Sequence, residues 1–81
     1  MLKEIFSKGL ATVSMPRIEL TGNRELVVSG ADGIKEYEND RLTLFSGRFA
    51  VTAVGRDLVI TSYNGEEAVV SGLIERLEFS F

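Results

Sequence analysis

The sequence predicts an all-β domain with a short N-terminal helix, and three observations carry this prediction. Short runs rich in Val, Ile, Thr and Tyr recur along the chain, as is typical of strands. Gly, Asn, Asp or Ser interrupts these runs at intervals of about 8 to 10 residues, a spacing typical of all-β domains. Finally, Asn64-Gly65 joins two such runs between Arg56 and Gly72. An Asn-Gly pair in this position is a strong hairpin signal, because a two-residue type I′ turn needs positive φ at both central residues.

The length of 81 residues predicts one domain, with residues 1–15 as a short amphipathic helix and linker and residues 16–81 as the β-domain. A chain of this size buries only roughly 60% of its unfolded surface, so small domains usually need disulfides, metals or oligomerisation. The chain has no Cys and no His. We therefore expect a homo-oligomer with no bound metal and no cofactor.

The charge pattern narrows the class of partner. The net charge is −3, and the nine basic residues are interleaved with twelve acidic ones. Without a basic patch, no nucleic-acid partner is expected. No apolar run approaches the ~20 residues of a membrane span, and the first residues lack a signal-peptide core. Together with the missing cysteines, this pattern predicts a cytoplasmic protein.

The N-terminal helix is predicted from Leu2, Ile5, Phe6 and Leu10, which fall at helical spacing, with Gly9 as a possible end. So short a helix is marginal in water and needs a surface to cover. One interpretation is a cover over a sheet face or an open sheet end. The other is an amphipathic contact with a membrane surface or a partner protein.

Pro16 cannot continue a helix and suits the start of a strand. Besides the two runs of the hairpin, strands are predicted at Arg17–Thr21, Glu25–Ser29, Ile34–Tyr37, Arg41–Phe45, Arg48–Val54 (closed by Gly55) and Leu73–Phe81. Within the last segment Ile74 is out of step with Leu77, Phe79 and Phe81, which predicts a bulge near Glu75-Arg76.

These elements predict a small antiparallel meander of six or seven short strands, curled as one sheet, closed as a barrel or stacked as a sandwich. A parallel β-roll is the alternative, since short strands with Gly at each corner could also coil. The segment Val27–Gly30 (VVSG) recurs as Val69–Gly72. Either chance or two hairpins of similar design would explain this repeat.

Several strands are apolar on both faces, around Val27, Val59 and Val69. A sheet with one solvated face would carry polar residues at half of these sites. The sequence therefore predicts a self-associating surface around these valines and the terminal Phe79 and Phe81. Leu2, Ile5 and Phe6 of the N-terminal helix are the next candidates.

The residues offer little catalytic chemistry. Without His and Cys there is no ordinary triad, thiol nucleophile or imidazole base, and no phosphate-binding glycine motif occurs. The acidic cluster Asp32, Glu36, Glu38 and Asp40 fits solvated turns better than a metal site. We expect no enzyme and no small-molecule substrate. A single-stranded nucleic-acid-binding β-barrel that uses Phe49, Tyr63 and nearby arginines is the alternative function.

The order and spacing of strands, glycines and apolar residues resemble the YabP/YqfC family of sporulation proteins from Firmicutes, and the YqfC branch most. The resemblance runs from Pro16 to Phe81 and is carried by Pro16–Leu20 with Gly22-Asn23, Gly33-Ile34 with Tyr37, Ser46-Gly47, Gly55 with Leu58 and Ile60, and Gly72, Ile74, Leu77 and Phe79. Ser29–Asp32 departs from the polar stretch that many YqfC-type sequences carry before the Gly-Ile pair. If that stretch serves a partner contact, the contact is changed here.

The resemblance implies a non-enzymatic role in spore formation, with no catalytic residues to carry over. It implies spore envelope assembly through protein-protein interaction, on the mother-cell side of the forespore envelope. Because family members tend to be encoded beside membrane proteins, it also implies a membrane-protein partner of the YqfD type.

Overall fold

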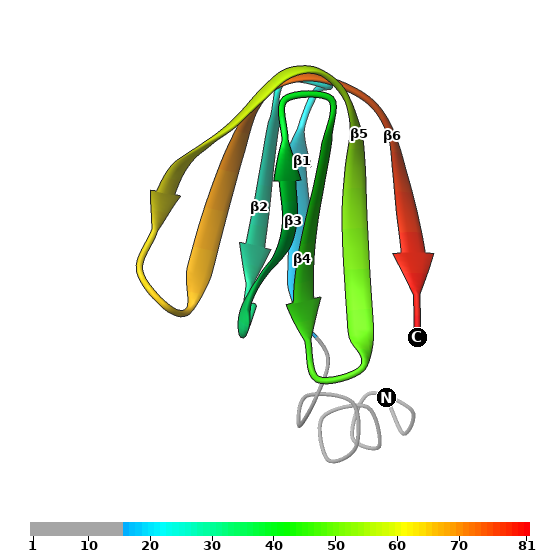
Figure 1. Ribbon diagram of the computed structural model, residues 1–81. Helices are drawn as coiled ribbons and strands as arrows, with labels where there is room; N and C mark the ends of the chain where they lie inside the picture. Colours follow the sequence, from blue (N-terminus) through cyan, green and yellow to red (C-terminus); the bar gives the residue numbers. More distant parts are fainter. Residues whose placement is uncertain (1–15) are drawn as a thin grey trace, which may run out of the picture.

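The computed structural model describes residues 16–81, which form six strands and no helix. The strands are β1 (Arg17–Thr21), β2 (Glu25–Ser29), β3 (Gly33–Glu38), β4 (Arg41–Ser46), β5 (Phe49–Tyr63) and β6 (Glu67–Ser80). They form one sheet in the order β1-β2-β6-β5-β4-β3, which is not closed into a barrel (Figure 1). Every neighbouring pair is antiparallel, so the predicted antiparallel fold is confirmed and the β-roll alternative is wrong. The predicted N-terminal helix lies outside the described residues.

The sheet is folded over on itself, because the long strands β5 and β6 bend near their middles (Figure 1). One layer contains β1, β2, the first half of β6 and the second half of β5. The other layer contains β3, β4, the first half of β5 and the second half of β6. Between them lies a core that includes Leu26 and Val28 of β2, Leu42 and Leu44 of β4, and Val70 of β6. The apolar side chains of alternate positions thus meet between the layers.

Glycines permit the bend. A Cβ on Gly55 would overlap the Leu73 carbonyl oxygen, and a Cβ on Gly72 would lie 2.5 Å from the Asp57 carbonyl oxygen. The strands can therefore approach this closely only without side chains at the two positions. Asp57 adopts φ 54°, and the pairing of β5 with β6 shifts register on both sides of it. The strand that was expected to end at Gly55 instead continues through it, because the residue serves as a bend rather than a turn.

The turn of the β1–β2 hairpin and the turn of the β3–β4 hairpin both hold the bend through backbone hydrogen bonds. The turn between β3 and β4 accepts backbone hydrogen bonds from β5, from Gly55 N to Asp40 O (3.1 Å) and from Leu58 N to Asn39 O (2.8 Å). The turn between β1 and β2 accepts the corresponding bonds from β6, from Gly72 N to Arg24 O (3.1 Å) and from Ile74 N to Asn23 O (2.8 Å). The two halves of the domain are therefore arranged alike around the bend.

The local predictions have mixed outcomes. The hairpin at Asn64-Gly65 is confirmed, but its turn is not type I′, because Gly65 has φ 90° whereas Asn64 is not among the positive-φ residues. The Asn64 side chain instead accepts hydrogen bonds from the backbone N–H groups of Glu66 (3.0 Å) and Glu67 (2.8 Å). The predicted bulge is confirmed, since Val54 pairs with Arg76 and Gly55 with Ile74, leaving Glu75 extra.

The repeated VVSG segments begin in the second strands of two hairpins, β1–β2 and β5–β6. They lie on the adjacent antiparallel strands β2 and β6, where Val27 pairs directly with Val69.

Candidate interaction surfaces

Three valines predicted as contact residues share the outward face of the first layer. Val27 pairs with Val69 across β2 and β6, and Val59 on β5 pairs with Ser71, two residues further along β6. Their chain neighbours point into the core, so the valines point out of it. Val59 is 44% exposed, and the other two are partly buried by their neighbours. We call Val27, Val59 and Val69 the valine patch.

Polar pairs border the valine patch. Arg17 and Glu19 of β1 form an ion pair of 2.7 Å, and the Ser29 hydroxyl lies 3.4 Å from the Glu67 carboxylate across β2 and β6. An apolar centre with a polar rim is the usual composition of a protein-protein contact surface.

Phe79 and Phe81 lie elsewhere. Phe79 pairs with the buried Val51, so it belongs to the core-facing side of the second layer, yet it is 59% exposed. Phe81 follows β6 and is 87% exposed. The ring of Phe79 packs beside that of Phe49, with centroids 5.9 Å apart. The predicted surface is thus divided between the valine patch and a separate aromatic group, and Leu2, Ile5 and Phe6 lie outside the described residues.

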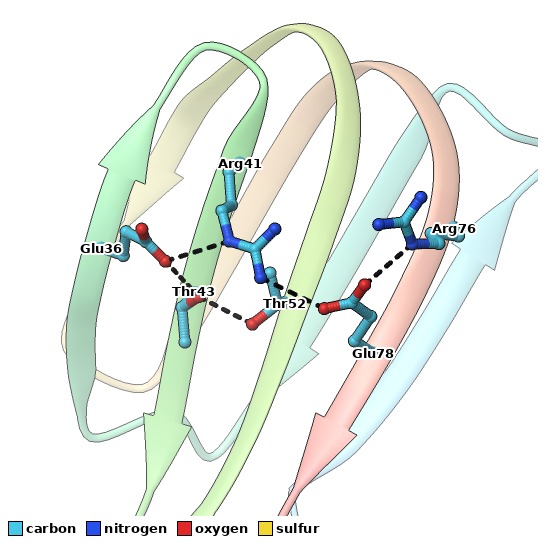
Figure 2. A network of polar contacts seen from close by, with 6 residues as sticks. All are labelled: Glu36, Arg41, Thr43, Thr52, Arg76 and Glu78. Atoms are coloured by element: carbon cyan, nitrogen blue, oxygen red, sulfur yellow. Dashed lines mark hydrogen bonds and ion pairs between the residues drawn. The ribbon is translucent and has the colours of Figure 1, made fainter.

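The outward face of the second layer carries a row of polar contacts instead of apolar side chains (Figure 2). Arg41 contacts Glu36 (3.5 Å) on one side and Glu78 (3.2 Å) on the other. The buried Thr43 hydroxyl lies 2.7 Å from that of Thr52 and donates to Glu36 (3.2 Å). Each member has a partner within the row, so this face is a self-satisfied polar surface.

The hydrogen bond from Arg76 (2.8 Å) lowers the pKa of the Glu78 carboxyl below its ordinary value, and the charge of Arg41 acts in the same direction. This carboxylate is therefore held ionised, whereas a general acid needs a raised pKa. The arrangement therefore links neighbouring strands and favours the ionised form of Glu78.

The predicted acidic cluster does not converge on one point. Asp32 accepts a hydrogen bond from Gly47 N (2.7 Å), while Glu36 belongs to the polar row of the second layer. Within residues 16–81, no group of three or more carboxylates could hold a metal ion. A surface hollow of about 530 Å³ has no Asp or Glu in its lining, which includes Lys35, Arg48 and Phe81.

The aromatic residues of the alternative nucleic-acid function have separate surroundings. Phe49, at the start of β5, packs with Phe79 of β6. Tyr63, at the end of β5, donates a hydrogen bond from its hydroxyl to the Asp32 carbonyl oxygen (3.2 Å). Tyr37 plays a related part, because its hydroxyl accepts a hydrogen bond from Ile60 N (2.9 Å). The two tyrosines tie β5 to the β3 side of the domain, a role that their positions in the sequence did not reveal.

Within residues 16–81, no helix is long and apolar enough to cross a membrane. The fold and its surfaces define a small antiparallel β-domain that carries apolar side chains outside its core.

The chain belongs to the YabP family, whose family model matches residues 13–81. This family is associated with sporulation and is not a known enzyme family. Searches of curated proteins and of solved structures gave no significant match.

Proposed function

We propose that this protein is a non-enzymatic assembly or adaptor domain of the YqfC type. In this proposal it acts in the cytoplasm on the mother-cell side of the forespore envelope, by self-association and by docking to a membrane protein of the YqfD type. Membership of a sporulation-associated family supports the proposed role in sporulation. The single observation that carries the proposed mode of action is the valine patch, an apolar group on an outward sheet face.

The two outward faces differ in a way that supports this choice of surface. On the second layer, the row of polar side chains that extends across the strands from Glu36 to Arg76 pairs its own charges. This row would lose hydration on burial. The valine patch would lose no polar contact on burial and would gain roughly 25 cal/mol for each Å² of apolar area removed from water. Contact through the first layer is therefore the less costly of the two.

Co-purification tests the proposal. The protein is co-expressed with a membrane protein of the YqfD type, and the complex is extracted in detergent. Val59→Lys places a charge in the valine patch and is expected to reduce recovery of the complex at least about tenfold, the effect of losing about 1.4 kcal/mol of binding. Asn39→Lys adds the same charge in an exposed turn at the bend and serves as the matched control. Equal recovery of both variants, or no complex with the wild type, would refute the proposal.

A further inference from the structure

The folded sheet has two sides along which strands of different layers face each other, and these two sides differ in their side-chain contacts. On one side, β3 faces the second half of β5, and the hydroxyls of Tyr37 and Tyr63 form hydrogen bonds with Ile60 N and Asp32 O across the gap. On the other side, β1 faces the second half of β6. Among residues 16–81, no side-chain hydrogen bond or ion pair joins β1 to that half of β6. We call this second side the open seam.

The open seam exposes side chains that belong to the core face. Leu20 pairs with the buried Leu26 and is itself 49% exposed. Across the seam, Leu77 and Phe79 pair with the buried Ala53 and Val51. A small hollow lined by Leu20, Ile74 and Leu77, among others, separates the two strands. Single exposed apolar residues are ordinary on protein surfaces, but Leu20 and Phe79 are both exposed on the core face, with the partly buried Leu77 beside them, which indicates a missing cover.

The point at which the preceding chain joins β1 indicates what the cover is. β1 forms one border of the seam and starts at Arg17, so residues 1–15 are attached directly to that border. The start of β1 and the end of β6 both lie away from the bend, at the open end of the domain (Figure 1). The point where residues 1–15 join the domain therefore lies at the same end of the sheet as Phe79 and Phe81.

The length and pattern of that segment fit the seam. Leu2, Ile5, Phe6 and Leu10 recur at helical spacing, and a helix over residues 2–10 would be about 14 Å long at 1.5 Å per residue. The stretch of β6 from Leu77 to Phe81 spans about 13 Å at 3.3 Å per residue. Residues 11–15 could bridge up to roughly 17 Å, which leaves room for the chain to turn back along β1.

We propose that the N-terminal segment of the same chain, through Leu2, Ile5, Phe6 and Leu10, packs over the open seam and completes the core between β1 and β6. Tethering favours this occupant over a second copy, because a short linker gives an effective concentration in the millimolar range. A helix of this length gains its stability from packing rather than from propensity, so docking and helix formation are coupled. This inference does not rest on the proposed function, since it concerns contacts within one chain.

Disulfide trapping in the full chain tests this inference, and the absence of native cysteines makes the result unambiguous. The test variant combines Ile5→Cys with Leu20→Cys in the seam. The matched control combines Ile5→Cys with Val59→Cys, because Val59 is 44% exposed and Leu20 49%, but Val59 lies on the outward face. Under mild oxidation, the seam pair is expected to form an intramolecular disulfide at least about tenfold faster than the control pair. Equal rates, or only intermolecular disulfides, would overturn the inference.

A second measurement removes any dependence on how the cysteine variants fold. Nuclear magnetic resonance spectra of the wild type and of Phe6→Asp are compared residue by residue. Loss of docking is expected to shift the resonances of Leu20, Leu77 and Phe79 and to leave those of Val59 in place. Unchanged resonances at the seam would contradict the proposed contact.

Discussion

Replacing Gly55 by Ala tests how the domain makes its bend. A Cβ at this position would overlap the carbonyl oxygen of Leu73 and lie 2.9 Å from the Leu73 carbonyl carbon. Carbon atoms in contact prefer about 3.5–4.0 Å, so the contact with the carbon alone requires β5 and β6 to part by about 0.6–1.1 Å, and the overlap with the oxygen requires more. The same movement would stretch the hydrogen bond from Gly55 N to Asp40 O, now 3.1 Å long. The substitution therefore acts on the strand pair and on the turn that holds it.

The expected loss follows from these two contributions. Overpacking in a well-packed site costs roughly 1–3 kcal/mol, and a weakened hydrogen bond costs about 1 kcal/mol more. The sum of about 2–4 kcal/mol is a large part of the roughly 4–12 kcal/mol expected for a chain of this size. With a urea m-value of about 1–1.5 kcal/mol per M, the unfolding midpoint would fall by about 1.3–4 M. Circular dichroism in urea measures this midpoint.

Gly47 provides the control, because it has φ 61° and nothing within 4 Å of an added Cβ. Gly47→Ala tests the cost of a left-handed backbone alone, about 1–2 kcal/mol. If Gly55→Ala is no less stable than Gly47→Ala, the steric explanation of the bend is wrong.

Substitutions at three further positions test the contacts around the sheet. Tyr37→Phe removes the acceptor of the Ile60 N–H bond, so we expect a loss of about 1 kcal/mol and faster hydrogen exchange at the Ile60 amide; an unchanged exchange rate would contradict the bond. Asn64→Ala removes the acceptor for two backbone N–H groups and is expected to cost about 1 kcal/mol by urea unfolding, whereas Asn64→Asp, which keeps an oxygen there, should cost less. Because the pKa of Glu78 is lowered in the folded state, its contribution is present above the ordinary value of 4.5 and is lost as pH falls through the folded pKa. Between pH 7 and pH 3, Glu78→Gln should therefore lose less stability than the wild type, and equal losses would refute this role.

Local patterns in the sequence were sufficient to predict most strands. Gly22-Asn23 and Asn64-Gly65 each mark a hairpin that the structure contains, and the phase of Ile74 against Leu77 predicts the bulge at Glu75. These features depend on residues close together in the chain, where turn chemistry and side-chain alternation act directly.

The pairing of β2 with β6 could not be predicted in this way, because it joins residues about 40 positions apart and depends on the whole fold. Gly55 illustrates a second difficulty, since a glycine at a bend and a glycine at a turn have the same sequence signal. The open seam was not predicted either, because it depends on how the two layers are arranged. Leu20 and Phe79 have ordinary core-facing positions in their strands, and only the layer arrangement shows that they are uncovered.

The most direct test of the central claim, that the domain acts through its valine patch, is the molar mass in solution. Size-exclusion chromatography with light scattering would be run over a range of concentrations on the wild type, Val59→Lys and Asn39→Lys. The account predicts a mass above the 8.9 kDa of one chain for the wild type and for Asn39→Lys, and a return to 8.9 kDa for Val59→Lys. A wild-type protein that stays at 8.9 kDa at every concentration would contradict it.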